Sequence, residues 1–559
     1  MLKFLLWFRF LLLFAVVNMS LSVSAQEFVV GNPLEIQPAL SGNFGELRPN
    51  HFHAGIDLKT AAREGLPIHV VEDGFVSRIK ISPYGYGKAI YVDHPNGYTT
   101  VYAHCQQFTD SIRGYVRRVQ REQQSFEIEV FPGETDLKVS RGDVIALSGN
   151  TGGSGGPHLH FEVRETKSEV PRNPLLYGFP LEDTKRPVVQ AIGIKPIGEE
   201  STVQSSTKTY RSRVTGTRIS AAQPIQVRGA FGLEISGFDQ QNGSSNSNGI
   251  YKIESFLDGE MISRFVADSI SFDKSRNLNA LIDYTYYYQT KRRYVRLYRL
   301  PGNQLENIDY KNDGVLHPSP GEHEVKVVAS DVSGNKTEVS FSIYFEPTDV
   351  EESSKKEILW NVPYFYETTD VKLYLPENTI YDNLEVDIET HPLADGAELL
   401  KIQQSNIPVQ TPFEIRMRFD GEYDGRTIIA QTNSKGTPSR ALATRKDGDW
   451  LVAESRSFGY FRISRDHRKP TISSINFSSG KTWNYGRMKF KVGDNFSGIQ
   501  SYRALVDGEW VLMEYEPKQD LMFIDVNLLP KSKEKQHLLI EITDAVGNVA
   551  NFEGTFYRL

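Results

Sequence analysis

Short runs of β-branched and aromatic residues, separated by turn dipeptides, constrain this chain more than any other feature of its sequence. Residues 67–71, 88–92 and 99–102 form runs of this kind, and Asp73-Gly74 and Asn96-Gly97 lie between them. Such runs are typical of antiparallel strands that are joined by tight turns. Because the same pattern continues to the end of the chain, we expect a mainly β fold.

The length of the chain requires several hydrophobic cores. It has 559 residues, which predicts roughly three to five domains. We expect a signal peptide at 1–25, an antiparallel β domain at 26–185, a β-sandwich at 186–348, a β-rich module at 357–466 and a second β-sandwich at 469–559.

An internal repeat relates the two expected sandwiches. Gly249-Ile250 and Gly498-Ile499 are each followed, nine residues after the glycine, by an Asp-Gly-Glu turn. Each copy later closes with Asp-x-x-Gly-Asn, at 331–335 and at 544–548. Two strand-rich units of this kind predict immunoglobulin-like modules. Because small polar residues accept positive φ, the closing element predicts a hairpin turn, and a calcium site at its aspartates is the alternative.

The first copy of the repeat holds about 36 more residues between these turns than the second copy. They include the aromatic and basic stretch 284–298. A long hairpin with aromatic pairs across its strands is the favoured interpretation of this stretch. A glycan-stacking surface is the alternative.

The N-terminus fits an export signal. Lys3 and Arg9 form a positive region, residues 10–17 are apolar, and Val23-Ser24-Ala25 has the small residues of a cleavage site. We therefore expect export to the periplasm, the cell envelope or the medium. An uncleaved anchor is the alternative, but the apolar run is shorter than the ~20 residues that cross a bilayer.

The cysteine count excludes a disulfide-stabilised fold, and the net charge argues against a nucleic-acid-binding protein. The one cysteine, Cys105, rules out internal disulfides. It adjoins His104, so a catalytic thiol is conceivable, but strand alternation predicts a buried structural side chain that points away from His104. The formal net charge of −7 leaves no basic footprint for nucleic acid.

Histidines concentrate where a metal site would lie, since seven of the twelve fall between residues 51 and 160. His53 and Asp57 are four positions apart, a separation of about 13 Å on a straight strand. Gly55 allows the chain to bend, so that both side chains could converge on one metal. In the strand predicted within residues 156–163, His158 and His160 face one side and Leu159 and Phe161 the other. Tyr102 and His104 are expected to share one face of an earlier strand.

Together these elements resemble the M23 family of metallopeptidases, of the lysostaphin and LytM type. The family signature is His-x-x-x-Asp, then Tyr-x-His, then His-x-His, with Gly-Asn-Thr-Gly before the last, here at 149–152. The match covers about residues 35–175. It implies Zn²⁺ bound by His53, Asp57 and His160, with His104 and His158 on the open side of the metal. It also implies endopeptidase action on peptidoglycan peptides.

The sequence departs from the family pattern in an insertion at about 107–135. Residues 107–124 place charged, apolar and polar side chains at helical spacing, which predicts a surface helix. This helix leaves the expected ligands intact and can change the walls of the substrate groove.

The remaining histidines and acids support the expected chemistry. No His-Glu-x-x-His motif occurs, so His158 is expected to act as the base towards water and His104 as stabiliser or proton donor, with exchanged roles as the alternative. Glu162 is either a partner that orients a ligand or an exposed strand residue. His51 is predicted to be structural, and His94 is predicted to lie at the surface.

Two other functions remain open at this point. The chain could be a non-catalytic regulator that keeps the LytM-type fold, or a surface-binding protein that acts through its β-sandwich tail. An envelope partner of the C-terminal modules is compatible with all three functions. The sequence does not say which peptide bond would be cleaved.

Overall fold

The computed structural model describes residues 28–222, 224–348 and 357–559. The expected signal peptide at 1–25 lies outside these residues. Nearly all regular elements are strands, as expected, and they gather around four main hydrophobic cores that follow one another along the chain. In the described residues no helix is both long and apolar enough to cross a membrane.

The N-terminal unit is built on a nine-stranded antiparallel sheet with the order β1-β4-β13-β8-β7-β6-β10, on which β11 pairs with β6 and β14 with β13. A second sheet has the order β5-β12-β9. The strands are β1 (Leu40–Gly42), β2 (Leu47–Arg48), β3 (His51–Phe52), β4 (Ile56–Lys59), β5 (Pro67–His69), β6 (Gly74–Ile81), β7 (Lys88–Asp93), β8 (Tyr98–Ala103), β9 (Gln107–Phe108), β10 (Ile128–Val130), β11 (Lys138–Val139), β12 (Val144–Leu147), β13 (His158–Glu165) and β14 (Pro171–Arg172).

The predicted surface helix is present as α2 (Asp110–Gln123). Its Ile112, Val116 and Val119 are buried against the N-terminal core, while the intervening charged side chains face outward. Three apolar positions at spacings of four and three residues form one stripe, which is why this segment is helical and amphipathic.

The first repeat unit places two sheets around one core, in the orders β18-β17-β15-β20-β23 and β16-β19-β26-β25-β21-β22-β24. Its elements are β15 (Val188–Pro196), β16 (Thr202–Val203), β17 (Tyr210–Thr215), β18 (Arg218–Ile219), β19 (Ile225–Arg228), β20 (Phe231–Phe238), β21 (Lys252–Leu257), β22 (Glu260–Val266), α3 (Leu278–Leu281), α4 (Tyr284–Thr290), β23 (Val295–Arg296), β24 (Ile308–Tyr310), β25 (Gly321–Ser330) and β26 (Lys336–Glu346).

The hairpin predicted for the aromatic stretch 284–298 is wrong, because its first half is the helix α4. Asp283 caps this helix by accepting a hydrogen bond from the backbone N–H of Tyr286. Arg211, from β17, then lies over the rings of Tyr286 and Tyr294. The cap and the cation–π stacking stabilise a helix where side-chain propensity alone favours a strand.

The third unit has two five-stranded sheets, β28-β29-β33-β37-β36 and β31-β32-β38-β34-β35. Its strands are β27 (Glu357–Ile358), β28 (Tyr364–Glu367), β29 (Val371–Leu375), β30 (Leu384–Glu385), β31 (Ile388–Pro392), β32 (Glu398–Ile402), β33 (Pro408–Arg418), β34 (Thr427–Thr432), β35 (Pro438–Ala441), β36 (Thr444–Asp447), β37 (Trp450–Ser457) and β38 (Gly459–Arg465).

The second repeat unit packs the sheets β39-β41-β45-β44 and β40-β47-β46-β42-β43. Its strands are β39 (Thr471–Ser474), β40 (Lys481–Thr482), β41 (Arg487–Gly493), β42 (Ile499–Val506), β43 (Glu509–Val511), β44 (Glu514–Glu516), β45 (Leu521–Asp525), β46 (Ser532–Asp544) and β47 (Val549–Arg558). Both closing Asp-x-x-Gly-Asn elements are hairpin turns, between β25 and β26 and between β46 and β47. The immunoglobulin-like class and the expected domain limits stay predictions.

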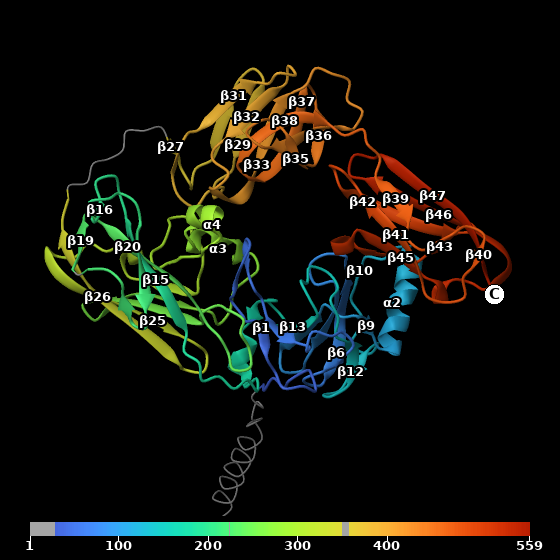
Figure 1. Cartoon of the computed structure of the whole chain (residues 1–559), viewed down its shortest axis with the longest axis horizontal. Coiled ribbons are helices and arrows are strands. Elements are labelled where there is room, and N and C mark those ends of the chain that lie inside the picture. The colour runs from blue at the N-terminus through green and yellow to red at the C-terminus, as the bar shows by residue number, and fades with distance from the viewer. Residues whose placement is uncertain (1–27, 223, 349–356) are drawn as a thin grey trace, which may run out of the picture.

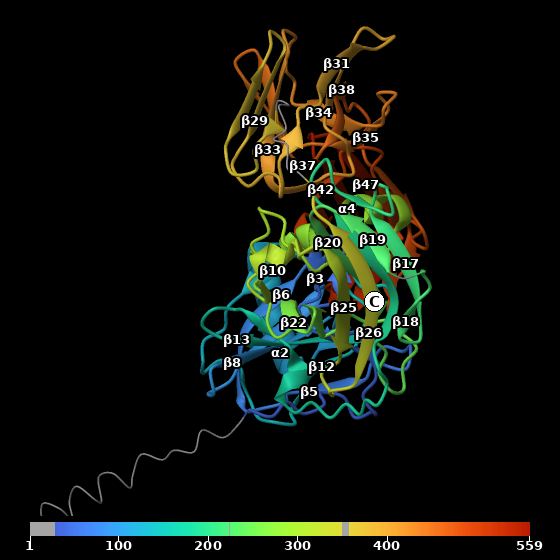
Figure 2. The ribbon, with the colours of Figure 1, turned by 90° about the vertical axis from the view of Figure 1, so that its left-hand side faces the viewer.

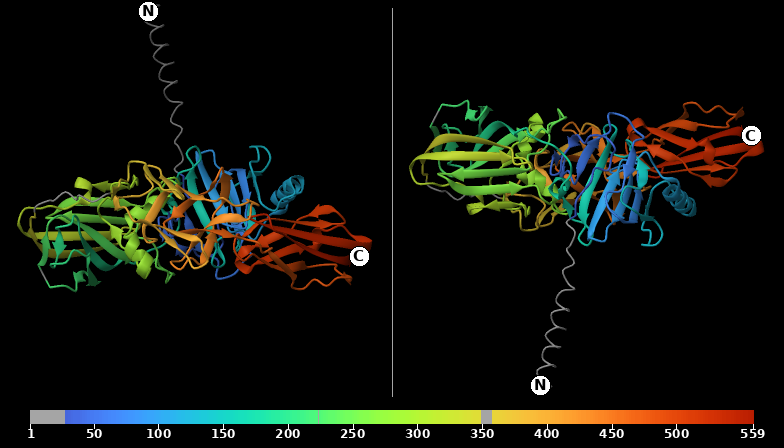
Figure 3. Two further views of the ribbon diagram at one scale, coloured as in Figure 1. Left: turned by 90° about the horizontal axis from the view of Figure 1, so that it is seen from above. Right: turned by 90° about the horizontal axis from the view of Figure 1, so that it is seen from below.

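The four units follow one another around a ring that closes when the last unit meets the first near α2 (Figure 1). Seen from the side, the third unit lies at one end and the N-terminal unit at the other (Figure 2). Seen from above and below, the two repeat units occupy opposite ends of the molecule (Figure 3). Lys88 of the first unit and Glu514 of the last form an ion pair of 2.7 Å at the closure.

Candidate metal centre

Cross-strand register brings two of the expected ligands together. β13 pairs with β4 so that His160 stands opposite Asp57, and with β8 so that His160 stands opposite Ala103. Gly55 does not adopt positive φ. A Cβ at this position would lie 2.3 Å from the carbonyl oxygen of Phe161, so glycine is required because β13 approaches so closely.

His53 arrives from a loop that the first repeat unit holds in place. Phe52, its neighbour, is buried in the core of that unit, where its ring stacks on Phe265 with a centroid distance of 6.5 Å. The backbone N–H of Phe52 also binds the hydroxyl of Ser275 at 2.9 Å. The position of this site residue is therefore set by two units and not by the N-terminal unit alone.

Three donor atoms meet at one point. Nε2 of His53, Oδ1 of Asp57 and Nδ1 of His160 lie 2.9–3.0 Å from one another. The side chains are buried, with 4–7% of their surface exposed. By type and position, the three residues can hold a metal ion.

Hydrogen bonds fix the tautomers of both imidazoles for this purpose. Nδ1 of His53 donates to the carbonyl of Asn43 at 2.8 Å, and Nε2 of His160 donates to Oε1 of Glu162 at 2.7 Å. Burial lowers the pKa of His160, but its hydrogen bonds to Asp57 and Glu162 raise it to about 9, so without a metal Nδ1 of His160 carries a proton that Oδ1 of Asp57 accepts. A metal ion can take the place of this proton, because Nε2 of His53, Oδ1 of Asp57 and Nδ1 of His160 would then all present lone pairs to it.

Ionisation of the ligand carboxylate also fits a metal. Burial alone would raise the pKa of Asp57, but the imidazoles of His53, His158 and His160 hold it well below its usual range. Arg48 donates to the other carboxylate oxygen, Oδ2, at 2.7 Å. Arg48 therefore leaves Oδ1 as the oxygen that faces the two histidines.

Glu162 is buried, so the exposed alternative for this residue is wrong. No part of its side chain is exposed, and it accepts hydrogen bonds from His160, from Nε of Arg164 at 2.6 Å and from the hydroxyl of Tyr86. Burial raises the pKa of Glu162, but the Arg164 guanidinium and His160 lower it to about 2. Sequence reasoning missed Arg164 and Tyr86. Arg164 could have been found, because positions 158, 160, 162 and 164 alternate on one face of a strand.

His158 and His104 lie beside the cluster. Nε2 of His158 is 3.4 Å from Oδ1 of Asp57, and the rings of His158 and His104 are 4.7 Å apart between centroids. Each donates its Nδ1–H to a carbonyl oxygen at 2.8 Å, that of Gly156 for His158 and that of Thr151 for His104. Both therefore present Nε2 as an acceptor. Burial and the neighbouring His160 and His158 lower the pKa of His104 to about 3, which keeps it neutral.

Strand alternation predicted that Tyr102 and His104 share one face, and this prediction is wrong. His104 has φ of 59°, which turns the chain after β8 and breaks the alternation. Tyr102 is fully buried, its ring packs edge-on against Phe161, and its hydroxyl bonds to Thr100 and to the backbone of Val71. It supports the core beneath the site.

The other histidines and Cys105 stay apart from the cluster. His51 is exposed and bonds to the carbonyl of Pro49. His94 is buried, against expectation, because its ring bridges the carbonyl of Asp73 and the hydroxyl of Thr100. Cys105 is buried as expected, and burial raises the pKa of its thiol to about 12.

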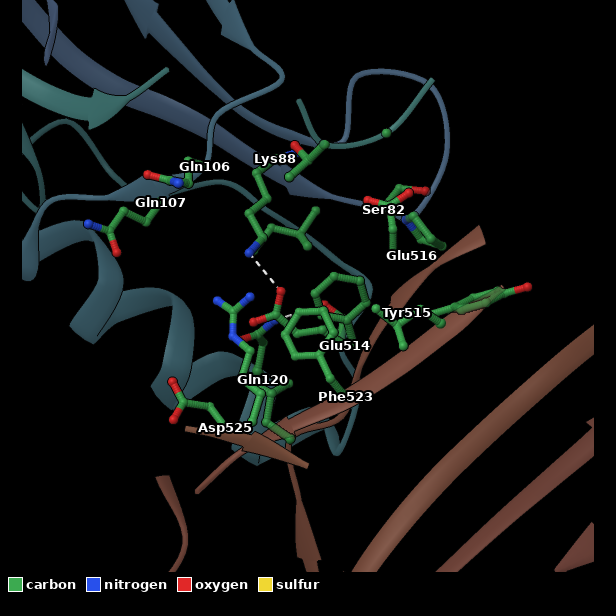
Figure 4. Close-up of a pocket in the computed structure, with 18 of the residues that line it drawn as sticks. Ser82, Lys88, Gln106, Gln107, Gln120, Glu514, Tyr515, Glu516, Phe523 and Asp525 are labelled. Carbon is green, nitrogen blue, oxygen red and sulfur yellow. Dashed lines mark hydrogen bonds and ion pairs between the residues drawn. The ribbon is translucent and has the colours of Figure 1, made fainter. Parts of the chain in front are cut away.

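A cavity of about 510 Å³ lies between the N-terminal unit and the last unit (Figure 4). Lys88, Gln106 and Gln120 line one side, and Glu514 and Tyr515 line the other. The metal-cluster residues do not line it. It reaches Thr151, whose carbonyl binds His104, so the cavity and the metal cluster lie against the same glycine-rich segment, residues 148–156.

The last unit also holds that segment directly. Nζ of Lys518 donates to the carbonyls of Asn150 and Ser154, the latter at 3.1 Å. The Ser154 hydroxyl in turn lies 3.1 Å from Nδ1 of His158. The insertion helix α2 and the last unit therefore both shape the rim beside the site.

Comparison with known proteins identifies the N-terminal unit. The model of Peptidase family M23 matches residues 51–124 and 127–174. The model of the Zu5-like domain matches residues 355–466, the third unit. The first match includes His53, Asp57, His104, His158 and His160.

Two curated relatives have enzymatic names. The chain is 34% identical over 128 residues to the DD-carboxypeptidase/endopeptidase Mpg of Neisseria meningitidis serogroup B, a match that spans 23% of each chain. It is 32% identical over 137 residues to the peptidoglycan DD-endopeptidase ShyA of Vibrio cholerae serotype O1, over 23% of this chain and 26% of that protein. The chain thus spans about a quarter of the length of these relatives.

A solved structure of a zinc-containing peptidase from Vibrio cholerae is 26% identical, with a TM-score of 0.20 over 27% of this chain and 40% of that one. The family of the N-terminal unit is assigned from the match to the model of Peptidase family M23 and not from this structural similarity. The part of the chain that holds the three-residue cluster is a Peptidase family M23 domain.

Proposed function

We propose that this protein is an exported zinc metalloendopeptidase that hydrolyses peptide cross-links of bacterial peptidoglycan. The observation that supports it best is the meeting of two imidazole nitrogens and one carboxylate oxygen within 3.0 Å of one another. His53, Asp57 and His160 are the proposed ligands. The M23 match over the same residues supports the reaction class.

The donor set suits zinc. Two imidazole nitrogens and one carboxylate oxygen form a catalytic three-ligand set and leave a fourth position for water or substrate. With metal–donor distances of ~2.1 Å, tetrahedral geometry needs donor pairs about 3.4 Å apart. A spreading of about 0.4 Å accommodates this.

Bound there, zinc would polarise the scissile carbonyl and lower the pKa of a water molecule towards ~7. His158 is the proposed base, because its free Nε2 lies beside Asp57, whose negative charge stabilises the imidazolium that forms. The proton then passes from His158 to the leaving nitrogen. His104, neutral and with Nε2 free, orients the water or the leaving amine by accepting a hydrogen bond.

Glu162 and Arg48 are proposed as positioning residues. Glu162 keeps the proton of His160 on Nε2, so that Nδ1 stays available for the metal. Arg48 keeps Asp57 ionised and turns one of its oxygens towards the ligands. Both effects preorganise the site before metal binds.

The names of the relatives support a cross-link between D-amino acids as the substrate. Mpg is named a DD-carboxypeptidase/endopeptidase, and ShyA is named a peptidoglycan DD-endopeptidase. A glycine bridge is the competing substrate. The C-terminal units are proposed to place the enzyme on an envelope partner, and the signal at residues 1–25 to direct its export.

The test is mass spectrometry of fragments released from defined cross-linked wall peptides by the purified full chain. We expect cleavage that is lost on metal removal and restored by zinc. His160→Ala should abolish it, whereas His51→Ala, which changes an exposed histidine near His53, should retain it. Fragments released by His160→Ala at the wild-type rate would refute the metal assignment. Zinc binding without cleavage of either cross-link would favour a regulatory protein.

A further inference from the structure

We propose that each repeat unit binds one calcium ion where the preceding unit enters it, a role separate from the peptidase site. In each unit three carboxylates offer oxygen atoms that lie within 4.8 Å of one another. The first site consists of Asp183, Asp239 and Asp331, and the second of Asp466, Asp494 and Asp544.

The two sites occupy matching places in the repeated fold. Asp239 directly follows β20, and Asp494 directly follows β41, the corresponding strand of the second copy. Asp331 follows β25, and Asp544 ends β46, in the closing hairpins.

The third ligand comes from the linker in both copies. Asp183 precedes β15 and Asp466 precedes β39, and each stands four residues before a proline, Pro187 or Pro470. Three separate segments thus bring an aspartate to the same point twice, although 92 positions separate Asp239 from Asp331 and only 50 separate Asp494 from Asp544.

In both sites, one carboxylate oxygen has no hydrogen-bond donor within the described residues. Asp239 is 2% exposed, and its Oδ1 has no hydrogen-bond donor, while Oδ2 accepts from Gln241 at 2.7 Å. A buried carboxylate oxygen without a donor is costly and calls for a ligand. Asp494 is half-buried, and its Oδ1 is likewise unpaired while Oδ2 accepts from the backbone of Phe496 and Gly498.

Protein cations do not neutralise either cluster. Within the described residues, no lysine, arginine or histidine forms an ion pair with any of the six aspartates. Lys185 is in the linker, yet its ammonium donates to the carbonyls of Gln241 and Ser244. Burial, and after it the charges of Asp331 and Asp183, raise the pKa of Asp239 to about 7. A bound cation removes this repulsion.

The Asp-x-x-Gly-Asn turn orients its aspartate towards the site and fastens the linker. Asn335 donates to Asp331 through its backbone N–H at 2.9 Å and through Nδ2 at 2.8 Å. The same Nδ2 lies 3.1 Å from the carbonyl oxygen of Asp183. Asn548 makes the equivalent contacts with Asp544 and with the carbonyl of Asp466. Each carboxylate oxygen keeps a second lone pair for a metal.

The ligand chemistry favours calcium. All side-chain donors are oxygens, which hard cations prefer, and nitrogen and sulfur ligands are missing from both clusters. Calcium takes six to eight oxygens in flexible geometry, and three carboxylates can supply up to six of them. Magnesium demands a regular octahedron and keeps several of its waters. A bound ion would fix the angle at which each linker joins its repeat unit.

The test is equilibrium dialysis of the zinc-loaded full chain against radioactive calcium. The dialysis buffer is first freed of other cations on a chelating resin. We expect two calcium ions per chain for the wild type and one for either Asp239→Asn or Asp494→Asn. The double variant should take up none. Asp370→Asn, a control at an exposed aspartate of the third unit, should take up two.

Thermal unfolding gives a second readout, with opposite signs for the two states. Without calcium, Asp239→Asn should raise the unfolding midpoint, because it removes a repelling charge. With millimolar calcium the wild type should gain several degrees, and the double variant should gain nothing. A purely structural aspartate would not reverse the order in this way. If Asp239→Asn fails to fold, Asp183→Asn tests the same site.

Three results would overturn the proposal. The first is no calcium uptake and no change of the wild-type midpoint at millimolar calcium. The second is uptake of magnesium but not of calcium, which would contradict the assignment of the ion. The third is full uptake by the folded double variant, which would place the ions elsewhere.

Discussion

Replacement of Glu162 by glutamine tests whether this buried carboxylate prepares His160 for metal. The change keeps the size of the side chain but removes its charge. Glu162 accepts from three donors, His160, Arg164 and Tyr86. The amide of glutamine has one oxygen to accept with, and its NH₂ group must face one of the donors.

Two magnitudes follow from this environment. Loss of the carboxylate that orients a ligand histidine typically lowers metal affinity about 10- to 100-fold, or about 1.4–2.7 kcal/mol. Arg164 is 4% exposed, and removal of the partner of a buried charge costs about 3–5 kcal/mol of folding free energy. The variant should therefore bind zinc more weakly and unfold at a lower temperature.

Zinc affinity is measured by competition with a chromophoric chelator, well below the unfolding temperature of both proteins. Glu169→Gln is the matched control, because Glu169 contacts the same Arg164 at 3.4 Å but is 61% exposed. It should change either quantity little. Equal zinc affinity of Glu162→Gln and the wild type would refute the orienting role of Glu162. If the variant is less stable but binds zinc as tightly as the wild type, the only role left for Glu162 is to neutralise Arg164.

Three further predictions concern the fold around the site. Cys105 should resist thiol reagents in the native protein and react on unfolding, and Cys105→Ala should keep its activity, because the thiol is buried and its pKa is about 12; rapid native labelling would contradict this. Phe52→Ala should cost about 3–5 kcal/mol by calorimetry and weaken zinc binding, since Phe52 anchors the loop of His53 in the first repeat unit; the exposed Phe365→Ala is its control. Lys88→Glu turns the ion pair with Glu514 into a repulsion, a change of about 1–2 kcal/mol that should favour an opened ring about five- to thirtyfold in small-angle scattering. Lys80→Glu, which changes a contact within the N-terminal unit, should leave the ring closed.

The sequence by itself determined the local features. Period-two alternation placed His158 and His160 on one face of a strand and Leu159 and Phe161 on the other, and the structure has this arrangement. The amphipathic stripe predicted α2, and the turn chemistry predicted both closing hairpins. These features depend on neighbours within a few positions of the chain, so a sequence displays them directly.

Tertiary structure decided what distant segments do to one another. Alternation failed at Tyr102 because His104 turns the chain, and propensity failed at 284–290 because Arg211 and Asp283 stabilise a helix there. The burial of Glu162, the anchoring of Phe52 in another unit and the meeting of three aspartates in each repeat unit all depend on contacts between segments far apart in sequence. Such contacts form only when the chain packs, because packing brings distant segments together. The low dielectric of the interior then strengthens the hydrogen bonds and ion pairs between them.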